Sequence, residues 1–309
     1  MFMLPPGHVH LWAAQPEQCQ KPPLLAQYRR LLDETETADW LRFRVEKKRQ
    51  EHLVARALLR TVLSRYAPVR PEQWRFRRSP AGKPAIDWRQ ILPAGMEATA
   101  NPPGRHDPAR PEEPTEYRSR LLSTVGQVPT NMPALEFNLS HTEDMILCAV
   151  TVGCPIGVDV EDTSRPADFL PLARRFFHPA ETALLENLSA DQLPLAFYRL
   201  WTLKEAYLKA LGAGLTGRLD AFGFRWATGR MPPSTAVRLP PADEAVVLPP
   251  MESDALELVL FSSAPVGQPG CWQFREFLLE GRLQVALAVA LPPPLHIILH
   301  QTIPLATPG

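Results

Sequence analysis

The sequence predicts an α+β protein made of two similar α+β subdomains in one chain. Apolar residues recur every three or four positions from Thr37 through Tyr66 and again from Leu193 to Leu211, which predicts a long helix in each half. Each helix is followed by a short aromatic and basic strand, WRFRR or FGFRW, and later by a hairpin whose last strand is small and apolar. This weak internal repeat predicts a pseudo-twofold arrangement with a ligand cleft between the halves.

We expect an N-terminal subdomain over residues 1–152, a C-terminal subdomain over 153–291 and a tail over 292–309. The 35 prolines gather between 93 and 133, between 232 and 250, and from Pro292 onward. Such stretches are typical of loops. Residues 87–134 therefore read as a proline-rich insertion, whose composition favours disorder.

In the N-terminal half, weak alternation over residues 9–14 predicts a first strand. Helical periodicity covers 24–32 and then 37–66, and prolines close the second helix. After WRFRR, the turn SPAGKPAI displays Lys83 on a defined corner between a glycine and a proline. A phosphate contact and a plain surface position both fit this lysine.

A hairpin follows the insertion. Alternating apolar residues over 135–139 and a second apolar run over 145–152 are separated by SHTED. His141 lies at the strand end between two hydroxyl side chains, Ser140 and Thr142. A structural and a functional role for this histidine are equally open.

Acidic residues recur with strand and helix spacing in the middle of the chain. In the strand-like IGVDVE, Asp159 and Glu161 would share one face, and in the helix-like WTLKEAYLK, Glu205 and Lys209 lie one turn apart. If the helix packs on the strand, three carboxylates converge beside one ammonium. Oxygen-only ligands suit magnesium, which suggests a phosphate-bearing substrate. Taken alone, the Glu205–Lys209 pair is also explained as a helix salt bridge worth about 0.3 to 0.5 kcal/mol.

Two helical patterns separate these acidic stretches. The second, HPAETALLENL, has Pro179 and Glu181 in its first turn, which explains Glu181 as a helix-start residue. Further strands are expected at 222–226, 256–261, 271–279 and 283–291.

Composition limits the classes of function. Lys plus Arg total 33 and Asp plus Glu total 33, so net charge does not indicate a nucleic-acid partner. The four cysteines form no close metal-ligand pairs and are too few for a disulfide scaffold. The N-terminus lacks a signal peptide pattern and no apolar run approaches eighteen residues. We expect a cytoplasmic monomer that binds neither nucleic acid nor membrane.

Five motifs carry a resemblance to a known family. GKPAI, FNLSHT, IGVDVE, RFFHPAE and WTLKEAYLKALGAGL occur in the order and spacing of 4′-phosphopantetheinyl transferases. The chain resembles their surfactin-type, two-subdomain branch over residues 9–86 and 135–291. The resemblance implies the fold of that family and transfer of the phosphopantetheine arm of coenzyme A to a serine of an apo acyl or peptidyl carrier protein. Adenosine 3′,5′-bisphosphate would be released.

The resemblance also implies catalytic roles. Asp159, Glu161 and Glu205 stand where the family binds Mg2+. Lys209 would neutralise the pyrophosphate of coenzyme A as the leaving group departs. The carrier serine needs a base, for which Glu205 and Glu181 are both candidates.

Coenzyme A contacts follow from the same resemblance. Ser140 and His141 match the segment that contacts its phosphates, and Lys83 matches the turn lysine near its adenosine end. Where the family usually places an arginine for the 3′-phosphate, this chain has Glu51. Arg49, two residues upstream, is the substitute that we consider.

Alternative functions stay open at this point. A binding protein for coenzyme A or a carrier protein that has lost turnover would explain Glu51, although the complete set of carboxylates argues against it. A different magnesium enzyme acting on nucleotides is disfavoured, because the chain has no GxxxxGK[ST]. From position alone, we expect carrier recognition around residues 174–177 (RRFF).

Overall fold

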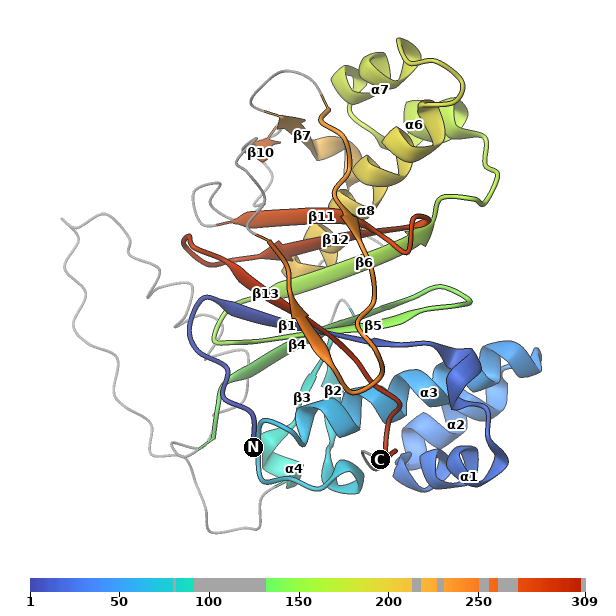
Figure 1. Ribbon diagram of the computed structural model, residues 1–309, viewed down its shortest axis with the longest axis vertical. Helices are drawn as coiled ribbons and strands as arrows, with labels where there is room; N and C mark the ends of the chain where they lie inside the picture. The colour runs from blue at the N-terminus through green and yellow to red at the C-terminus, as the bar shows by residue number, and fades with distance from the viewer. Residues whose placement is uncertain are drawn as a thin grey trace, which may run out of the picture.

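The protein has two β-sheets that face each other, each covered on its outer side by one long helix (Figure 1). The computed structural model describes residues 1–79, 82–91, 132–212, 218–226, 231–249, 256–260 and 272–306. Apolar side chains from both sheets fill the layer between them, among them Leu11, Val158 and Val285. This architecture confirms the predicted α+β class.

The first sheet has five strands in the order β4-β5-β1-β13-β9. Strand β1 runs parallel to β13 and antiparallel to β5. The bounds of its strands are β1 (His8–Ala14), β4 (Leu135–His141), β5 (Ile146–Val152), β9 (Ala245–Val247) and β13 (His296–Gln301).

The second sheet has four strands in the order β6-β12-β11-β8. Its strands are β6 (Ile156–Asp162), β8 (Ala236–Val237), β11 (Gln273–Leu279) and β12 (Leu283–Val289). Two strand pairs stand apart from both sheets: β2 (Phe76–Arg78) with β3 (Pro84–Ile86), and β7 (Phe222–Trp226) with β10 (Leu256–Leu260).

The helices divide between the two sheets. Helix α3 covers the five-stranded sheet and shares a core with Trp12 and Phe137, whereas α8 covers the four-stranded sheet and packs on Ala286 and Ala288. The α-helices are α1 (Pro22–Leu31), α2 (Glu34–Arg42), α3 (Glu46–Leu63), α4 (Trp88–Ile91), α6 (Phe169–Phe176), α7 (Pro179–Glu186) and α8 (Leu193–Leu211).

Strands β4 and β6 join the two sheets through side chains. The backbone N–H of Val158 donates to Oδ1 of Asn138 (2.9 Å), and the N–H of Val160 donates to Oγ of Ser140 (3.3 Å). At this junction of the two sheets, which we call the seam, side chains of β4 accept the hydrogen bonds that a neighbouring strand's backbone would otherwise accept from β6. As a consequence, Ser140 comes directly beside the acidic end of β6.

The prediction of one long helix over residues 37–66 is wrong in one respect, because this stretch forms two helices, α2 and α3, with a break between them. The backbone at Phe43 and Val45 is extended, with ψ of 121° and 120°. The guanidinium of Arg49 donates to the carbonyl oxygen of Phe43 (2.7 Å), which satisfies a group that a continuous helix would have used. The β-branched Val45 also favours an extended conformation at this point.

The predicted tail is also wrong, because residues 296–301 form β13 between β1 and β9. The run HIILHQ has strand-forming residues, but the prolines before it suggested a loop. Strand β9 likewise lies within 232–250, which we expected to be irregular. Two strands from late in the chain therefore complete the sheet of the N-terminal half, while the division at residue 152 stays a prediction.

Most other predicted elements are confirmed. The hairpin β4–β5, strand β6 and strands β7, β10, β11 and β12 lie within a few residues of their expected bounds, and α8 has the predicted bounds. Of the predicted insertion, residues 92–131 lie outside the described residues. In the described part of the chain, no helix has the length and hydropathy needed to cross a bilayer.

Candidate active site

Helix α8 crosses strand β6 at a glycine. A Cβ added to Gly157 would lie 1.9 Å from the carbonyl oxygen of Ala206 and 2.6 Å from the backbone nitrogen of Ala210. Both distances are far below van der Waals contact, so only glycine allows the helix to approach this closely. This approach carries Glu205 and Lys209 of the helix to the acidic face of the strand.

Asp159 is the centre of the site. Its Oδ1 accepts a hydrogen bond from the ammonium of Lys209 (2.5 Å) and one from the hydroxyl of Ser140 (2.9 Å). Lys209 also donates to Oγ of Ser140 (2.9 Å) and to the carbonyl of Val158 (3.2 Å). Ser140 and Asp159 are buried, at 5% and 4% exposure, so the network is fixed within the seam.

The three predicted carboxylates influence one another's pKa values. Burial raises the pKa of Glu161 to about 7; the charge of Asp159 raises it too, while Lys209 and Arg165 oppose the shift. Burial and the charge of Asp159 also raise the pKa of Glu205, against the effect of Lys209. These side chains are therefore close enough to destabilise one another's charges, with one ammonium to offset them.

The carboxylates of the site offer the oxygen ligands that a hard cation prefers. Oδ2 of Asp159 is buried and has no hydrogen-bond partner among the described residues. A buried carboxylate oxygen without a donor is costly and suits a hard cation. In the part of the chain that the structure describes, no three Asp, Glu, His or Cys side chains already stand at coordination distance of one ion.

His141 and the start of α3 form the opposite wall of the site. Burial lowers the pKa of His141, Glu51 and Asp159 raise it, and Lys209 and Lys48 lower it further. The charges that act on the imidazole thus come both from the acidic centre and from the first turns of α3. Glu51 is 1% exposed and pairs with the ammonium of Lys48 (2.8 Å), while its Oε1 has no partner among the described residues.

Lys48 is a site residue that the sequence analysis missed, since several cations on this helix looked equivalent. Arg49, which the sequence analysis considered as the ligand of the 3′-phosphate, contacts residues of α2, its own helix and the connection between them. Its guanidinium donates to the carbonyl of Phe43 (2.7 Å), pairs with Glu46 (3.3 Å) and lies over the ring of Trp40. Lys48, and not Arg49, is among the charges that shift the pKa of His141.

Lys83 reaches the site region from the N-terminal half. Its ammonium donates to the carbonyl of Ala210 (2.8 Å), in the last turn of α8, and to that of Ile156 (3.3 Å). Burial lowers its pKa, and Glu136 opposes this shift. A cation at the C-terminal end of a helix is favourable, so Lys83 ties the end of α8 to β6. The phosphate contact predicted for it stays a prediction.

Glu181 is separate from these residues. Its Oε2 pairs with the fully buried ammonium of Lys204 (2.8 Å), and its Oε1 accepts from the backbone N–H of Phe224 (2.9 Å). Oε2 also accepts from the N–H of His178 at the start of α7 (3.2 Å). Both oxygens are thus engaged in holding α7 to α8 and β7. These contacts correct the prediction of Glu181 as a base and give it a structural role.

The surface expected at residues 174–177 is partly buried. Phe177 is 3% exposed and stacks on Phe197, and Arg174 pairs with Glu186 (2.7 Å). A separate hollow of about 440 Å³, lined by β7, β10, Trp272 and Phe274, includes no acidic residue of β6 or α8. Neither feature belongs to the carboxylate site.

Comparisons with known proteins show the family to which this chain belongs. Residues 155–242, which contain β6 and α8, match the model of the 4′-phosphopantetheinyl transferase superfamily. The 4′-phosphopantetheinyl transferase HetI of Nostoc sp. is 32% identical over 207 residues, covering 67% of this chain and 70% of HetI. The 4′-phosphopantetheinyl transferase Sfp of Bacillus subtilis is 38% identical over 95 residues, 31% of this chain and 41% of Sfp. A Xenopus laevis relative, the L-aminoadipate-semialdehyde dehydrogenase-phosphopantetheinyl transferase, is 32% identical over 106 residues and is covered to 35% of its length.

Proposed function

Because the chain belongs to the 4′-phosphopantetheinyl transferase superfamily, we propose that the carboxylates at the crossing of β6 and α8 are its catalytic centre. The protein is an enzyme that transfers the 4′-phosphopantetheine moiety of coenzyme A to a serine of a carrier protein. The observation that carries the assignment is the buried Asp159, with one oxygen held by Lys209 and the other without a donor among the described residues.

We propose Asp159, Glu161 and Glu205 as the ligands of Mg2+. Their oxygen-only chemistry and the unpartnered Oδ2 of Asp159 support this assignment. When bound there, Mg2+ would supply positive charge to the pyrophosphate of coenzyme A. The raised pKa values of Glu161 and Glu205 are consistent with carboxylates that await a cation.

Lys209 neutralises the leaving group in this proposal. Its ammonium lies in the seam, where charge interactions are stronger than in bulk water. As the serine oxygen attacks the phosphorus that bears the pantetheine arm, the P–O bond to adenosine 3′,5′-bisphosphate breaks and the electron pair stays on that leaving group. The hydroxyl of Ser140 donates to Asp159 and accepts from Lys209, which fixes the positions of these two side chains relative to each other.

Glu205 is our candidate for the base that takes the proton of the carrier serine, directly or through a water. A carboxylate whose pKa is raised is a stronger base at neutral pH than an ordinary one. It lies on the same helix face as Lys209, so the proton acceptor and the charge that stabilises the leaving group share one rigid element. Glu181 has no part in this step.

We assign the coenzyme A phosphates to the wall formed by His141 and Lys48. Lys48 is half-exposed and lies at the mouth of the site, but its partner Glu51 competes with a phosphate for it. Lys83 and Ser140 keep the roles of predicted coenzyme A contacts. The cytoplasmic location, the monomeric state and the absence of nucleic-acid and membrane partners likewise stay predictions.

Intact-mass measurement of an apo carrier protein tests the proposed centre. Incubation with coenzyme A and Mg2+ is expected to add one phosphopantetheine group, and chelation of the metal is expected to prevent the gain. Asp159→Asn is expected to reduce the rate by about two orders of magnitude or more. Retention of full activity in Asp159→Asn or after chelation would overturn the assignment.

A further inference from the structure

The connection between α2 and α3 displays apolar side chains to solvent. Leu41 is 60% exposed, Phe43 37% and Val45 60%, and exposed arginines stand between them at 42 and 44. We call residues 41–45, which are the last two residues of α2 and the three residues that connect it to α3, the interhelix linker. Single exposed apolar residues are ordinary, whereas a contiguous group framed by charges marks an interaction surface.

The interhelix linker opens a strongly basic stretch in a chain without net charge. Residues 41–49 contain one acid, Glu46, and five cations: Arg42, Arg44, Lys47, Lys48 and Arg49. Arg44 makes no hydrogen bond or ion pair with any other described residue, and the side chain of Arg42 is 80% exposed although it pairs with Asp39. Arg44 is thus available to a partner, Arg42 is largely exposed beside Asp39, and the charge of both selects an acidic partner.

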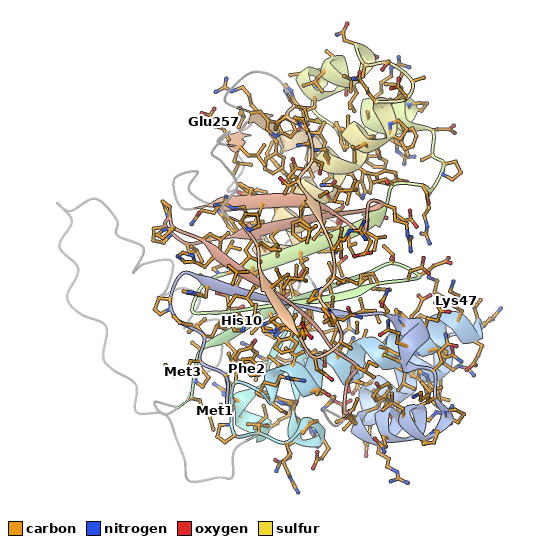
Figure 2. The ribbon with its side chains drawn as sticks, viewed as in Figure 1. Met1, Phe2, Met3, His10, Lys47 and Glu257 are labelled. Carbon is orange, nitrogen blue, oxygen red and sulfur yellow. The ribbon has the colours of Figure 1, made fainter. Side chains whose placement is uncertain are left out.

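The position of the interhelix linker relates it to the active site. It leads into the first turn of α3, which carries Lys47 (Figure 2). The ammonium of Lys47 lies 2.6 Å from Oε2 of Glu143 in the β4–β5 turn. That turn directly follows His141. Glu143 also contacts Arg165 (3.1 Å), which lies in the loop after β6. The interhelix linker is thus joined, through Lys47 and Glu143, to the turn that follows His141 and to the loop that follows β6.

The geometry points to the interhelix linker as the docking surface for the carrier protein, through an acidic segment of the carrier with apolar residues between its acids. The inference rests on the proposed function, because that function supplies the macromolecular acceptor. Apolar contacts with Leu41 and Val45 would hold the carrier, and Arg42 and Arg44 would steer its approach. The surface expected from the sequence at 174–177 has fewer side chains available to a carrier protein, because Phe177 is buried and Arg174 is paired with Glu186.

Steady-state kinetics of the full chain test this surface. In Leu41→Ser/Val45→Ser we expect the KM for carrier protein to rise about tenfold, with kcat and the KM for coenzyme A within about twofold of wild type. In Arg42→Glu/Arg44→Glu we expect a similar rise in KM, together with loss of the salt dependence of kcat/KM. On a short synthetic peptide around the acceptor serine, which lacks the body of the carrier, both variants should equal wild type.

Matched controls separate docking from general effects. Val247→Ser removes a 65% exposed valine from β9, and Arg30→Glu reverses an exposed charge on α1. Neither should change the KM for carrier protein. Thermal unfolding confirms that all variants are folded, which is expected because the altered side chains are exposed.

The outcomes distinguish this inference from the proposed function. If wild type modifies no carrier protein, the proposed function itself fails. If wild type is active but the linker variants keep its KM for the carrier, docking at this surface is refuted. Loss of binding to anionic phospholipid vesicles in these variants, with unchanged KM for the carrier, would assign the surface to a membrane and also refute the inference.

Discussion

Replacement of Gly157 by alanine tests whether the crossing of β6 and α8 sets the geometry of the site. An ordinary carbon to oxygen contact is about 3.5 Å, but the new Cβ would meet the carbonyl oxygen of Ala206 at 1.9 Å. The helix must therefore retreat by roughly 1.5 Å. Because Lys209 is 2.5 Å from Asp159, a retreat of this size breaks the contact between them.

The expected cost of Gly157→Ala follows from this displacement. Overpacking of a buried contact destabilises by about 1 to 3 kcal/mol, and misplacement of a catalytic group by about 1 Å lowers turnover about a hundredfold. We expect a lower Tm and a kcat reduced about a hundredfold at a temperature where the variant is folded. Thermal unfolding and carrier loading by mass spectrometry measure the two effects.

The clash is with backbone atoms, which provides a further check. Adding Ala206→Gly to Gly157→Ala should not restore activity, since the carbonyl oxygen of residue 206 remains. Gly281→Ala is the control, because an added Cβ there meets nothing within 4 Å, although its positive φ of 69° carries its own strain. Wild-type kcat and Tm in Gly157→Ala would refute the geometric account.

Three further predictions concern single side chains. Glu205→Gln should reduce kcat by two or more orders of magnitude without loss of stability, and a rate on apo carrier close to wild type would exclude Glu205 as ligand and base. Glu161→Gln should raise the stability of the metal-free protein at pH 8 but not at pH 5. The reason is that the pKa of Glu161 rises from its ordinary 4.5 to about 7 on folding, so wild-type stability falls as pH rises between these values. After discounting for solvent screening, the gain is about 1 to 2 kcal/mol by chemical denaturation; equal stability of both proteins at pH 8 would contradict the clustering of acids. Glu181→Gln should cost about 3 to 5 kcal/mol, because Lys204 is left buried without a counter-ion, while kcat of the folded fraction stays near wild type. A loss of kcat without loss of stability would restore Glu181 to the mechanism.

Glu51 is the position at which this chain departs from the sequence pattern that it shares with 4′-phosphopantetheinyl transferases. Glu51→Gln releases Lys48 from a buried carboxylate, so the KM for coenzyme A should fall about tenfold, which corresponds to one charge-assisted hydrogen bond. Lys48→Gln serves as the matched control and should raise that KM. An unchanged KM in both variants would remove Lys48 from the binding site.

Local periodicity predicts which acidic and basic side chains face the same way on each element. Asp159 and Glu161 share a strand face, and Glu205 and Lys209 share a helix face, so the only unknown was whether the two elements pack together. Gly157 is the residue that allows α8 to pack closely on β6. The sequence does not show this, because it depends on which atoms of α8 lie against the glycine. The sequence could not reveal Lys204 as the partner of Glu181, because a buried ion pair between separate helices leaves no periodic signal.

The missed elements have physical causes as well. Strand β13 follows a run of prolines and pairs with β1, nearly three hundred positions away in the sequence, so only tertiary structure identifies it as a strand. The break between α2 and α3 occurs where periodicity continues but Arg49 captures a backbone carbonyl. That break creates the interhelix linker, which therefore also escaped prediction.

Binding of Mn2+ as a spectroscopic substitute for Mg2+ tests the central claim most directly. Electron paramagnetic resonance on the purified protein with coenzyme A is expected to show one bound ion in wild type. Asp159→Asn should lose it, and Glu181→Gln should keep it. Equal binding of Mn2+ by wild type and Asp159→Asn would contradict the assignment of the metal to the crossing of β6 and α8.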